Sequence, residues 1–142
     1  MLARVHRMLP ALWAGMLLAI AALAAPAAFA NLAAADAGRV VSHIFPREAW
    51  LSLVLAVLLL GLERRHGAPD RVNTRLLWGT MACTLLGYFA IQPLLPAARA
   101  GQGVLSFGQL HLISTLFYGL KTALVLVLAW RGAADLNRRS FS

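Results

Sequence analysis

The chain has 142 residues, of which 61% are hydrophobic, and its mean hydropathy is +0.73. Soluble domains contain about 45–50% apolar residues, so this composition excludes an ordinary soluble domain and is typical of a membrane protein. Thirteen Lys and Arg residues stand against five Asp and Glu residues, and the net charge is +8. Because these charges lie between and beyond the apolar runs, they indicate membrane orientation and anionic lipid headgroups rather than nucleic-acid binding.

The first apolar run predicts a membrane span over residues 9–32, with no charged residue inside it. A helix needs about 20 apolar residues to cross a bilayer, and this run is long enough. Ala11, Gly15 and Ala19 follow one another at four-residue spacing. Small residues at that spacing let two helices approach closely, although an alanine-rich helix also produces the pattern by chance.

Residues 1–30 have a second interpretation, because they resemble a secretory signal. A basic start and an apolar middle precede Ala28-Phe29-Ala30, which has the small-x-small form of a cleavage site. The uncharged run is longer than the usual apolar region of such signals, about 7–15 residues, so we expect the segment to be retained as a span.

The segment from Asn31 to Phe45 predicts a short amphipathic helix at the outer membrane surface, ended by Pro46. Asp36 and His43 fall on one helical face, and the apolar side chains of its second half fall toward the other.

The second predicted span, residues 47–64, is the shortest. Its uncharged part, from Ala49 to Leu62, has only fourteen residues, but the flanking Arg47 and Arg64 can snorkel and lengthen it. The alternative is a buried or re-entrant segment. The third and fourth spans are predicted over residues 76–97 and 106–130, and only Lys121 interrupts the fourth. The sequence therefore predicts an all-α membrane four-helix bundle in a single domain, residues 1–142.

Arginine placement predicts the orientation of the four spans. The segment before the first span, the connection between the second and third, and the tail after the fourth together carry nine arginines. The opposite side carries three: Arg39, Arg47 and Arg99. By the positive-inside rule, both termini are expected in the cytoplasm.

The fourth span carries a polar stripe, which we define as His111, Ser114, Thr115, Tyr118, Thr122 and Lys121. At about 100° per residue the first five share one helical face and Lys121 lies at its edge. Such a stripe is expected to face other helices or water, because lipid cannot satisfy its hydrogen bonds. Tyr88 and Gln92 of the third span are expected near it and complete the candidate intramembrane site.

Lys121 lies ten residues before Arg131, about 15 Å along the helix and close to the membrane centre. No Asp or Glu lies inside any predicted span, and Glu48 and Glu63 are placed at the ends of the second. Lys121 is therefore expected to snorkel, to be neutral or to face a wet cavity. It either forms a proton or ligand site or is a tolerated lysine whose amine finds a carbonyl.

Thr80, Thr84 and Gly87 form a matching stripe on the third span, and we expect the third and fourth spans to pack through these faces. The alternative for the threonines is a hydrogen bond to a carbonyl in the preceding turn.

The histidines and sulfur ligands do not indicate a metal or haem site. His43 is the only other histidine on the side of His111, and Met81 and Cys83 lie on the third span toward the other side. We expect no cofactor and no metal.

The motifs PAAFANL, AGRVVSHIF, GYFAIQP and FGQLHLIS, in this order among four apolar segments, resemble one family over nearly the whole chain. It is the bacterial membrane family called domain of unknown function 4149, which is similar to transmembrane protein 205. The resemblance implies retention of residues 1–30 and a location in the bacterial inner membrane. It implies as signature positions Pro26, Phe29, Gly38, Phe45, Gln92, Pro93, Gly108, His111 and Ser114. Lys121 matches no position of that pattern.

The resemblance implies no activity. We expect a non-enzymatic protein that self-associates or has a membrane partner, since the connections are too short for a catalytic domain and no nucleophile–base–acid constellation is present. The alternative is a transporter or channel subunit with the polar stripe along its path, and a third, less favoured, is a copper- or haem-handling protein.

Overall fold

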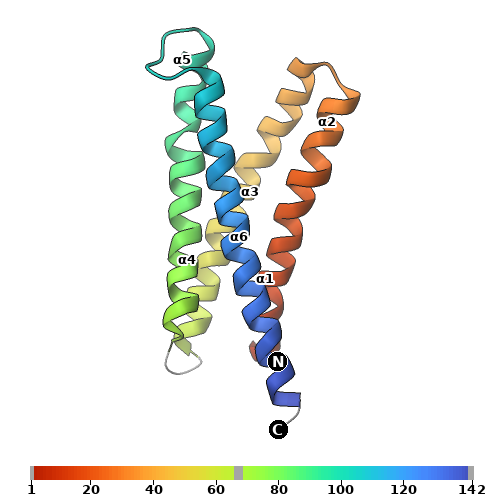
Figure 1. The fold of residues 1–142 in the computed structure, drawn as a ribbon, viewed down its shortest axis with the longest axis vertical. Coiled ribbons are helices and arrows are strands. Elements are labelled where there is room, and N and C mark those ends of the chain that lie inside the picture. The colour runs from red at the N-terminus through yellow and green to blue at the C-terminus, as the bar shows by residue number, and fades with distance from the viewer. Residues whose placement is uncertain (1, 66–68, 141–142) are drawn as a thin grey trace.

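The computed structural model describes residues 2–65 and 69–140, with side chains for 5–65 and 69–134. Four long, apolar helical segments run antiparallel and pack as a bundle (Figure 1), which confirms the predicted all-α membrane four-helix bundle. We call the end with both termini and the α3–α4 connection the termini end. The opposite end, with the α2–α3 and α5–α6 connections, is the distal end.

Helices and connections alternate simply along the chain. The first segment contains α1 (Leu2–Ala19), the π-helical η1 (Ile20–Ala24) and α2 (Ala25–Asn31), and the second is α3 (Ala34–Arg65). The third contains α4 (Arg71–Thr84), the π-helical η2 (Leu85–Ala90), the 3₁₀ turn η3 (Gln92–Leu94) and α5 (Leu95–Arg99), and the fourth is α6 (Phe107–Ser140). Each segment is long and apolar enough to cross a membrane, and each overlaps one predicted span.

The predicted separate amphipathic helix is wrong, because α3 continues from Ala34 through Pro46 to Arg65 as a single helix. A proline removes one amide donor from a helix and usually disturbs the turn before it. Here the helix continues without a break, and the carbonyl left without its amide donor is that of Ser42. The Arg47 side chain donates to the neighbouring His43 carbonyl oxygen at 2.5 Å. At about 1.5 Å per residue α3 is about 48 Å long, which exceeds the roughly 30 Å hydrocarbon core.

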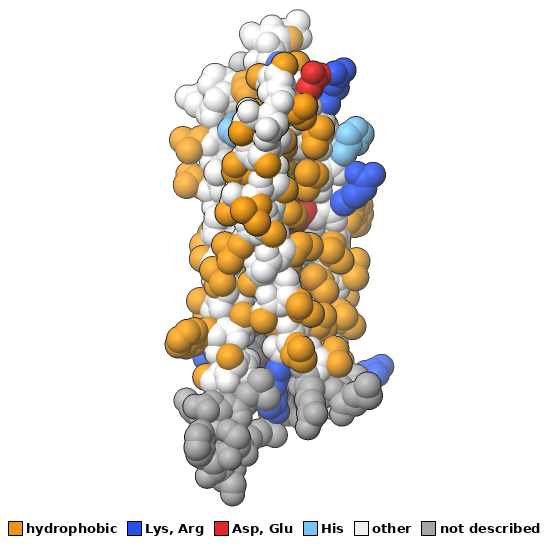
Figure 2. Space-filling model, turned by 90° about the vertical axis from the view of Figure 1, so that its right-hand side faces the viewer, with side chains coloured by type: hydrophobic (Ala, Val, Ile, Leu, Met, Phe, Trp, Pro, Cys, Tyr) orange, Lys and Arg blue, Asp and Glu red, His pale blue; other side chains and the backbone are white. Residues whose placement is uncertain are grey.

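The amino-terminal half of α3 carries a polar edge that explains the amphipathic pattern. Asp36 pairs with Arg39, and Arg39, His43 and Arg47 follow at four-residue spacing with exposed side chains. Figure 2 shows charged and histidine side chains gathered on one edge of the distal half, above a band that is mostly apolar. The segment is amphipathic as predicted, but it extends the second span.

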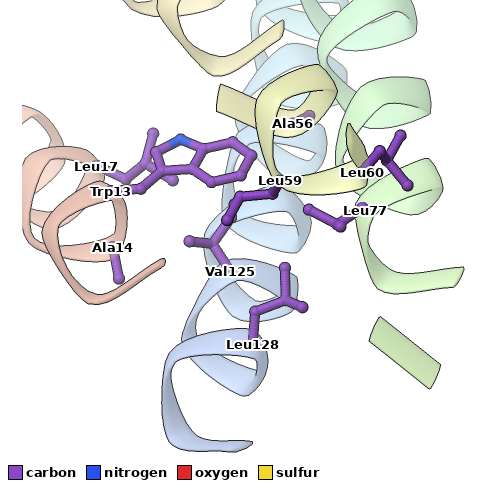
Figure 3. Packing of buried hydrophobic residues seen from close by; sticks show 9 residues of the cluster. All are labelled: Trp13, Ala14, Leu17, Ala56, Leu59, Leu60, Leu77, Val125 and Leu128. Carbon is purple, nitrogen blue, oxygen red and sulfur yellow. The ribbon is translucent and has the colours of Figure 1, made fainter. Parts of the chain in front are cut away.

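The main apolar core lies in the half of the bundle nearer the termini, and every long segment contributes to it (Figure 3). Its largest fully buried members are Trp13 and Leu17 of α1, Leu59 of α3, Leu77 of α4 and Val125 of α6. A smaller cluster of Ile91, Ala98 and Leu110 joins the third segment to α6 near the distal end. The layer between the two clusters holds the buried Glu48, Ser52 and Lys121.

Candidate functional site

Glu48 of α3 and Lys121 of α6 form an ion pair inside the bundle. The Lys121 Nζ donates to Glu48 Oε1 at 2.7 Å, and the two residues are only 3% and 4% exposed. The expectation that no carboxylate lies inside a span is therefore wrong. Because α3 does not end at Pro46, Glu48 lies fourteen residues inside the helix instead of at its start.

A chain of hydrogen bonds continues from this pair to α1. The Ser52 hydroxyl, one turn after Glu48 on α3, donates to Glu48 Oε1 at 2.5 Å. The Trp13 indole N–H donates to the Ser52 oxygen at 3.0 Å. A carboxylate with two such donors is well satisfied in a medium without water. The ion pair therefore links α6 to α3, and the hydrogen bond between Trp13 and Ser52 links α3 to α1.

Tyr118 covers the ion pair and ties α6 to α1. Its ring lies 4.8 Å from Lys121 Nζ, a cation–π distance, and its hydroxyl donates to the Leu17 carbonyl oxygen at 3.0 Å. Phe45 of α3 packs its ring edge-on against Tyr118, with centroids 5.6 Å apart. The ammonium is thus enclosed by one carboxylate and one aromatic face.

The remaining members of the polar stripe lie apart. Ser114 is half-buried and donates to the Gly87 carbonyl oxygen at 2.8 Å, whereas Thr115 and Thr122 bond back to carbonyls of α6 itself. His111 is exposed and stacks on Phe107 at 5.9 Å. The buried face of α6 centres about 60° away from His111 at about 100° per residue.

The two candidates from the third span also lie away from the ion pair. Tyr88 is half-buried and contacts the ring of Phe89 edge-on at 5.1 Å, and Gln92 is exposed at the distal end. The structure therefore brings Tyr118 and Lys121 together with Glu48 and Ser52. It does not bring His111, Tyr88 or Gln92 to them.

The third and fourth segments pack closely at Gly87, as the sequence predicted. A Cβ atom at this position would lie 2.4 Å from Phe117 Cβ, so only glycine fits against α6. For the threonines the alternative holds, because Thr80 and Thr84 donate to the carbonyls of Leu77 and Thr80 respectively.

A second polar network closes the termini end. Arg131 of α6 donates to Asp70 at 2.7 Å and to the Asn73 side-chain oxygen at 2.8 Å. The Asn73 amide donates to Glu63 Oε1 at 2.9 Å, and His6 Nε2 lies 3.4 Å from the same oxygen. A cavity of about 200 Å³ adjoins these residues. The network joins all four long segments. The sequence had indicated only that the loops at this end carry charged residues.

Asp70 also caps α4, because its carboxylate accepts from the backbone N–H groups of Val72 and Asn73. Partial desolvation acts to raise the pKa of Asp70. The two backbone hydrogen bonds and the Arg131 guanidinium outweigh it together, so the pKa lies below its ordinary value. Asp70 is therefore held as a carboxylate.

The sequence interpretation missed Glu48, Ser52 and Trp13. The signal was present, because Glu48 and Ser52 are four residues apart and share a helical face once Pro46 is allowed inside a helix. The partnership with Lys121, 73 residues away, depends on how α3 and α6 pack and has no local signature.

A second cavity, of about 320 Å³, lies at the distal end between the start of α3 and the η3–α5 turn. Gly38 and Gln92, two of the signature positions, line it together with Arg39 and Arg99. Within residues 5–65 and 69–134, no three His, Cys, Asp or Glu side chains are grouped as metal ligands.

Comparisons with known proteins identify the family. No curated protein and no solved structure matches the chain significantly. The family model of the domain of unknown function DUF4149 matches residues 8–103, which include most of the first long segment and all of the second and third, and end before the FGQLHLIS motif. This match extends over more than half of the chain, and the protein therefore belongs to the DUF4149 family, a multi-pass membrane member with four helices able to cross the bilayer.

Proposed function

We propose that the protein is a non-enzymatic interaction protein of the bacterial inner membrane that associates with a second copy of itself. The observation that carries this proposal is the outward position of the small-residue face on α1. Ala11, Gly15 and Ala19 are all exposed, and a Cβ atom at Gly15 would meet nothing within 4 Å. The close helix approach that this face permits is not used within the chain.

The state of the buried charges supports an interaction role over a transport role. Glu48 and Lys121 neutralise each other, and Glu48 also accepts a hydrogen bond from Ser52. The two cavities at the ends of the bundle are lined by other residues. This buried pair fixes α3 relative to α6, since breaking it would leave an uncompensated charge inside the bundle.

The proposed orientation places both termini in the cytoplasm. Within the described side chains, the arginines at the termini end are Arg7, Arg64, Arg65, Arg71, Arg75 and Arg131, and those of the distal half are Arg39, Arg47 and Arg99. This asymmetry follows the positive-inside rule.

Cysteine crosslinking in native membranes tests self-association. The single native cysteine, Cys83, is buried and is replaced by alanine in all variants. Gly15→Cys places a thiol on the small-residue face, and Val57→Cys places a matched thiol on an exposed apolar position of α3. We expect an oxidant to give a disulfide dimer with Gly15→Cys and not with Val57→Cys. Monomer alone, or equal dimer from both variants, contradicts the proposal, and a crosslink to another protein would replace self-association by partner binding.

Proton transport is the second candidate, and one observation favours it. Two carboxylate clusters, at Glu48 and at Glu63, lie at different depths on the same helix with the apolar core between them. In proteoliposomes with an imposed pH gradient, transport predicts proton flux that Glu48→Gln abolishes. The interaction proposal predicts the same passive leak for the wild type, Glu48→Gln and empty vesicles.

A further inference from the structure

The distal cavity combines apolar walls with positively charged edges. Ala34, Ala35 and Gly38 form its side on α3, and Leu95 and Pro96 form part of its side on α5. Arg39 and Arg99 line it from the two opposite elements. A cavity of this kind is suited to a ligand that is both anionic and partly apolar.

The available donors in this cavity match a phosphate group. Arg39 pairs with Asp36 through one guanidinium nitrogen, and Arg99 Cζ lies 4.7 Å from the centroid of the Phe107 ring. Each guanidinium has five N–H donors, so both keep further N–H groups for another acceptor. The Gln92 amide lines the same space. Guanidinium groups bind phosphate through paired, charge-assisted hydrogen bonds, which are stronger than neutral ones.

The charge balance at this end favours an anion. Among the residues that line this cavity or pair with its lining, Arg39 and Arg99 stand against the single carboxylate of Asp36. An anionic group between the two arms of the bundle would offset this excess. It would also connect α3 with α5 where the cavity separates them.

The depth of the cavity corresponds to the lipid headgroups. Arg39 lies about 38 Å from Arg64 along α3, at about 1.5 Å per residue. The hydrocarbon core is about 30 Å thick and the bilayer with headgroups about 40–45 Å. With Arg64 in one headgroup layer, Arg39 therefore lies in the other. Trp50 lies eleven residues after Arg39, about 16 Å deeper along α3. It is 61% exposed and contacts Phe89 edge-on, which places aromatic rings at a depth that acyl chains from this leaflet reach.

We infer that the distal cavity binds the phosphate group of an anionic phospholipid from the leaflet on the distal side. Arg39 and Arg99 hold the phosphate, and the small residues of α3 leave room for the glycerol backbone. The acyl chains run toward Trp50 and Phe89. This lipid site does not depend on self-association, because none of the residues that line it belongs to the small-residue face of α1.

Native mass spectrometry of the full-length protein in detergent tests the site with phosphatidylglycerol as the probe. The double variant Arg39→Gln/Arg99→Gln should bind the lipid at least about tenfold more weakly, because two charge-assisted contacts are lost. The matched control Arg64→Gln/Arg75→Gln removes two exposed arginines from the termini end and should bind as the wild type does. Equal loss in both variants would overturn the site.

A steric variant separates the cavity from charge alone. A Cβ atom at Gly38 or at Gly61 of the same helix meets nothing within 4 Å, so a side chain can be added at both positions without a clash at its Cβ atom. Gly38→Leu fills the cavity and should reduce phosphatidylglycerol binding to a similar degree, whereas Gly61→Leu should not. Unchanged binding by Gly38→Leu would contradict the inference.

Two further arms identify the source of the phosphate. Phosphatidylcholine, whose cation offsets its phosphate, should bind more weakly than phosphatidylglycerol, and millimolar inorganic phosphate should not displace the bound lipid. Equal affinity for the two lipids would overturn the anionic-lipid assignment. Displacement by inorganic phosphate would show a site for the free ion and would likewise overturn it.

Discussion

Lys121 Nζ and Glu48 Oε1 are 2.7 Å apart in the interior of a bundle whose surface is mostly apolar. The two residues come from helices that run parallel to each other, α3 and α6, and neither residue is more than 4% exposed. A lone ammonium at this depth would be costly in a membrane. The Glu48 carboxylate and the Tyr118 ring stabilise the ammonium directly, and the Ser52 hydroxyl donates a hydrogen bond to the carboxylate.

Removing one charge should destabilise the protein strongly. Lys121→Met leaves Glu48 as a buried, unpaired carboxylate, and we expect a loss of about 3–5 kcal/mol in the free energy of unfolding. Thermal unfolding in detergent measures the effect. The adjacent Leu120→Met is the control, because Leu120 is 52% exposed and should change stability by less than about 0.5 kcal/mol. A Lys121→Met variant as stable as the control would show that the ion pair does not stabilise the folded bundle.

Gly87→Ala should disrupt the packing of η2 on α6. The added Cβ atom would lie 2.4 Å from Phe117 Cβ, so the helices must move apart and the Ser114 hydrogen bond to the Gly87 carbonyl weakens. We expect a loss of about 1–3 kcal/mol, the usual cost of overpacking. Gly119→Ala, where a Cβ atom meets nothing within 4 Å, is the matched control and should be neutral or slightly stabilising. Equal melting temperatures for the two variants would argue against the close contact.

Asp70 should make the termini end sensitive to acid. Its pKa is lowered in the folded protein, so the carboxylate contributes stability that is fully present above the ordinary pKa of 3.8 and is lost as the pH falls through the folded value. The side chain is 43% exposed, and solvent screening limits the Arg131 contribution to about 1 kcal/mol or less.

Asp70→Asn keeps an acceptor for the cap of α4 and removes the charge. Its unfolding temperature should lie below that of the wild type at pH 6, and the difference should shrink as the pH is lowered through the acid range to 3. The measurement is thermal denaturation at a series of pH values. A difference between the two proteins that stays constant over this range would contradict the role of the carboxylate.

Much of the architecture followed from the sequence for a simple physical reason. Lipid tolerates only segments whose backbone is internally hydrogen-bonded and whose side chains are mostly apolar, so the four apolar runs predicted four helices. Gly87 was also predictable as a contact, because a small residue beside hydroxyls on a helix favours close packing.

The ion pair was not predictable in the same way. Proline usually ends a helix, and Pro46 led to placing Glu48 at the end of a span instead of inside it. The continuation of α3 through Pro46 cannot be read from composition. The pairing of Glu48 on α3 with Lys121 on α6 is a tertiary relationship, and the rotation of α6 that buries Lys121 and exposes His111 is set by packing against α1 and the third segment.

The most direct test of the account is a double-mutant cycle on the unfolding free energy of wild type, Glu48→Leu, Lys121→Met and the variant with both changes. Each single variant leaves a buried charge, whereas the double variant replaces the pair by apolar side chains, an exchange that is often neutral or stabilising in other proteins. The account predicts that the double variant is more stable than either single variant, with a coupling of several kcal/mol. Losses that simply add would contradict it, because they would show that Glu48 and Lys121 do not hold each other inside the bundle.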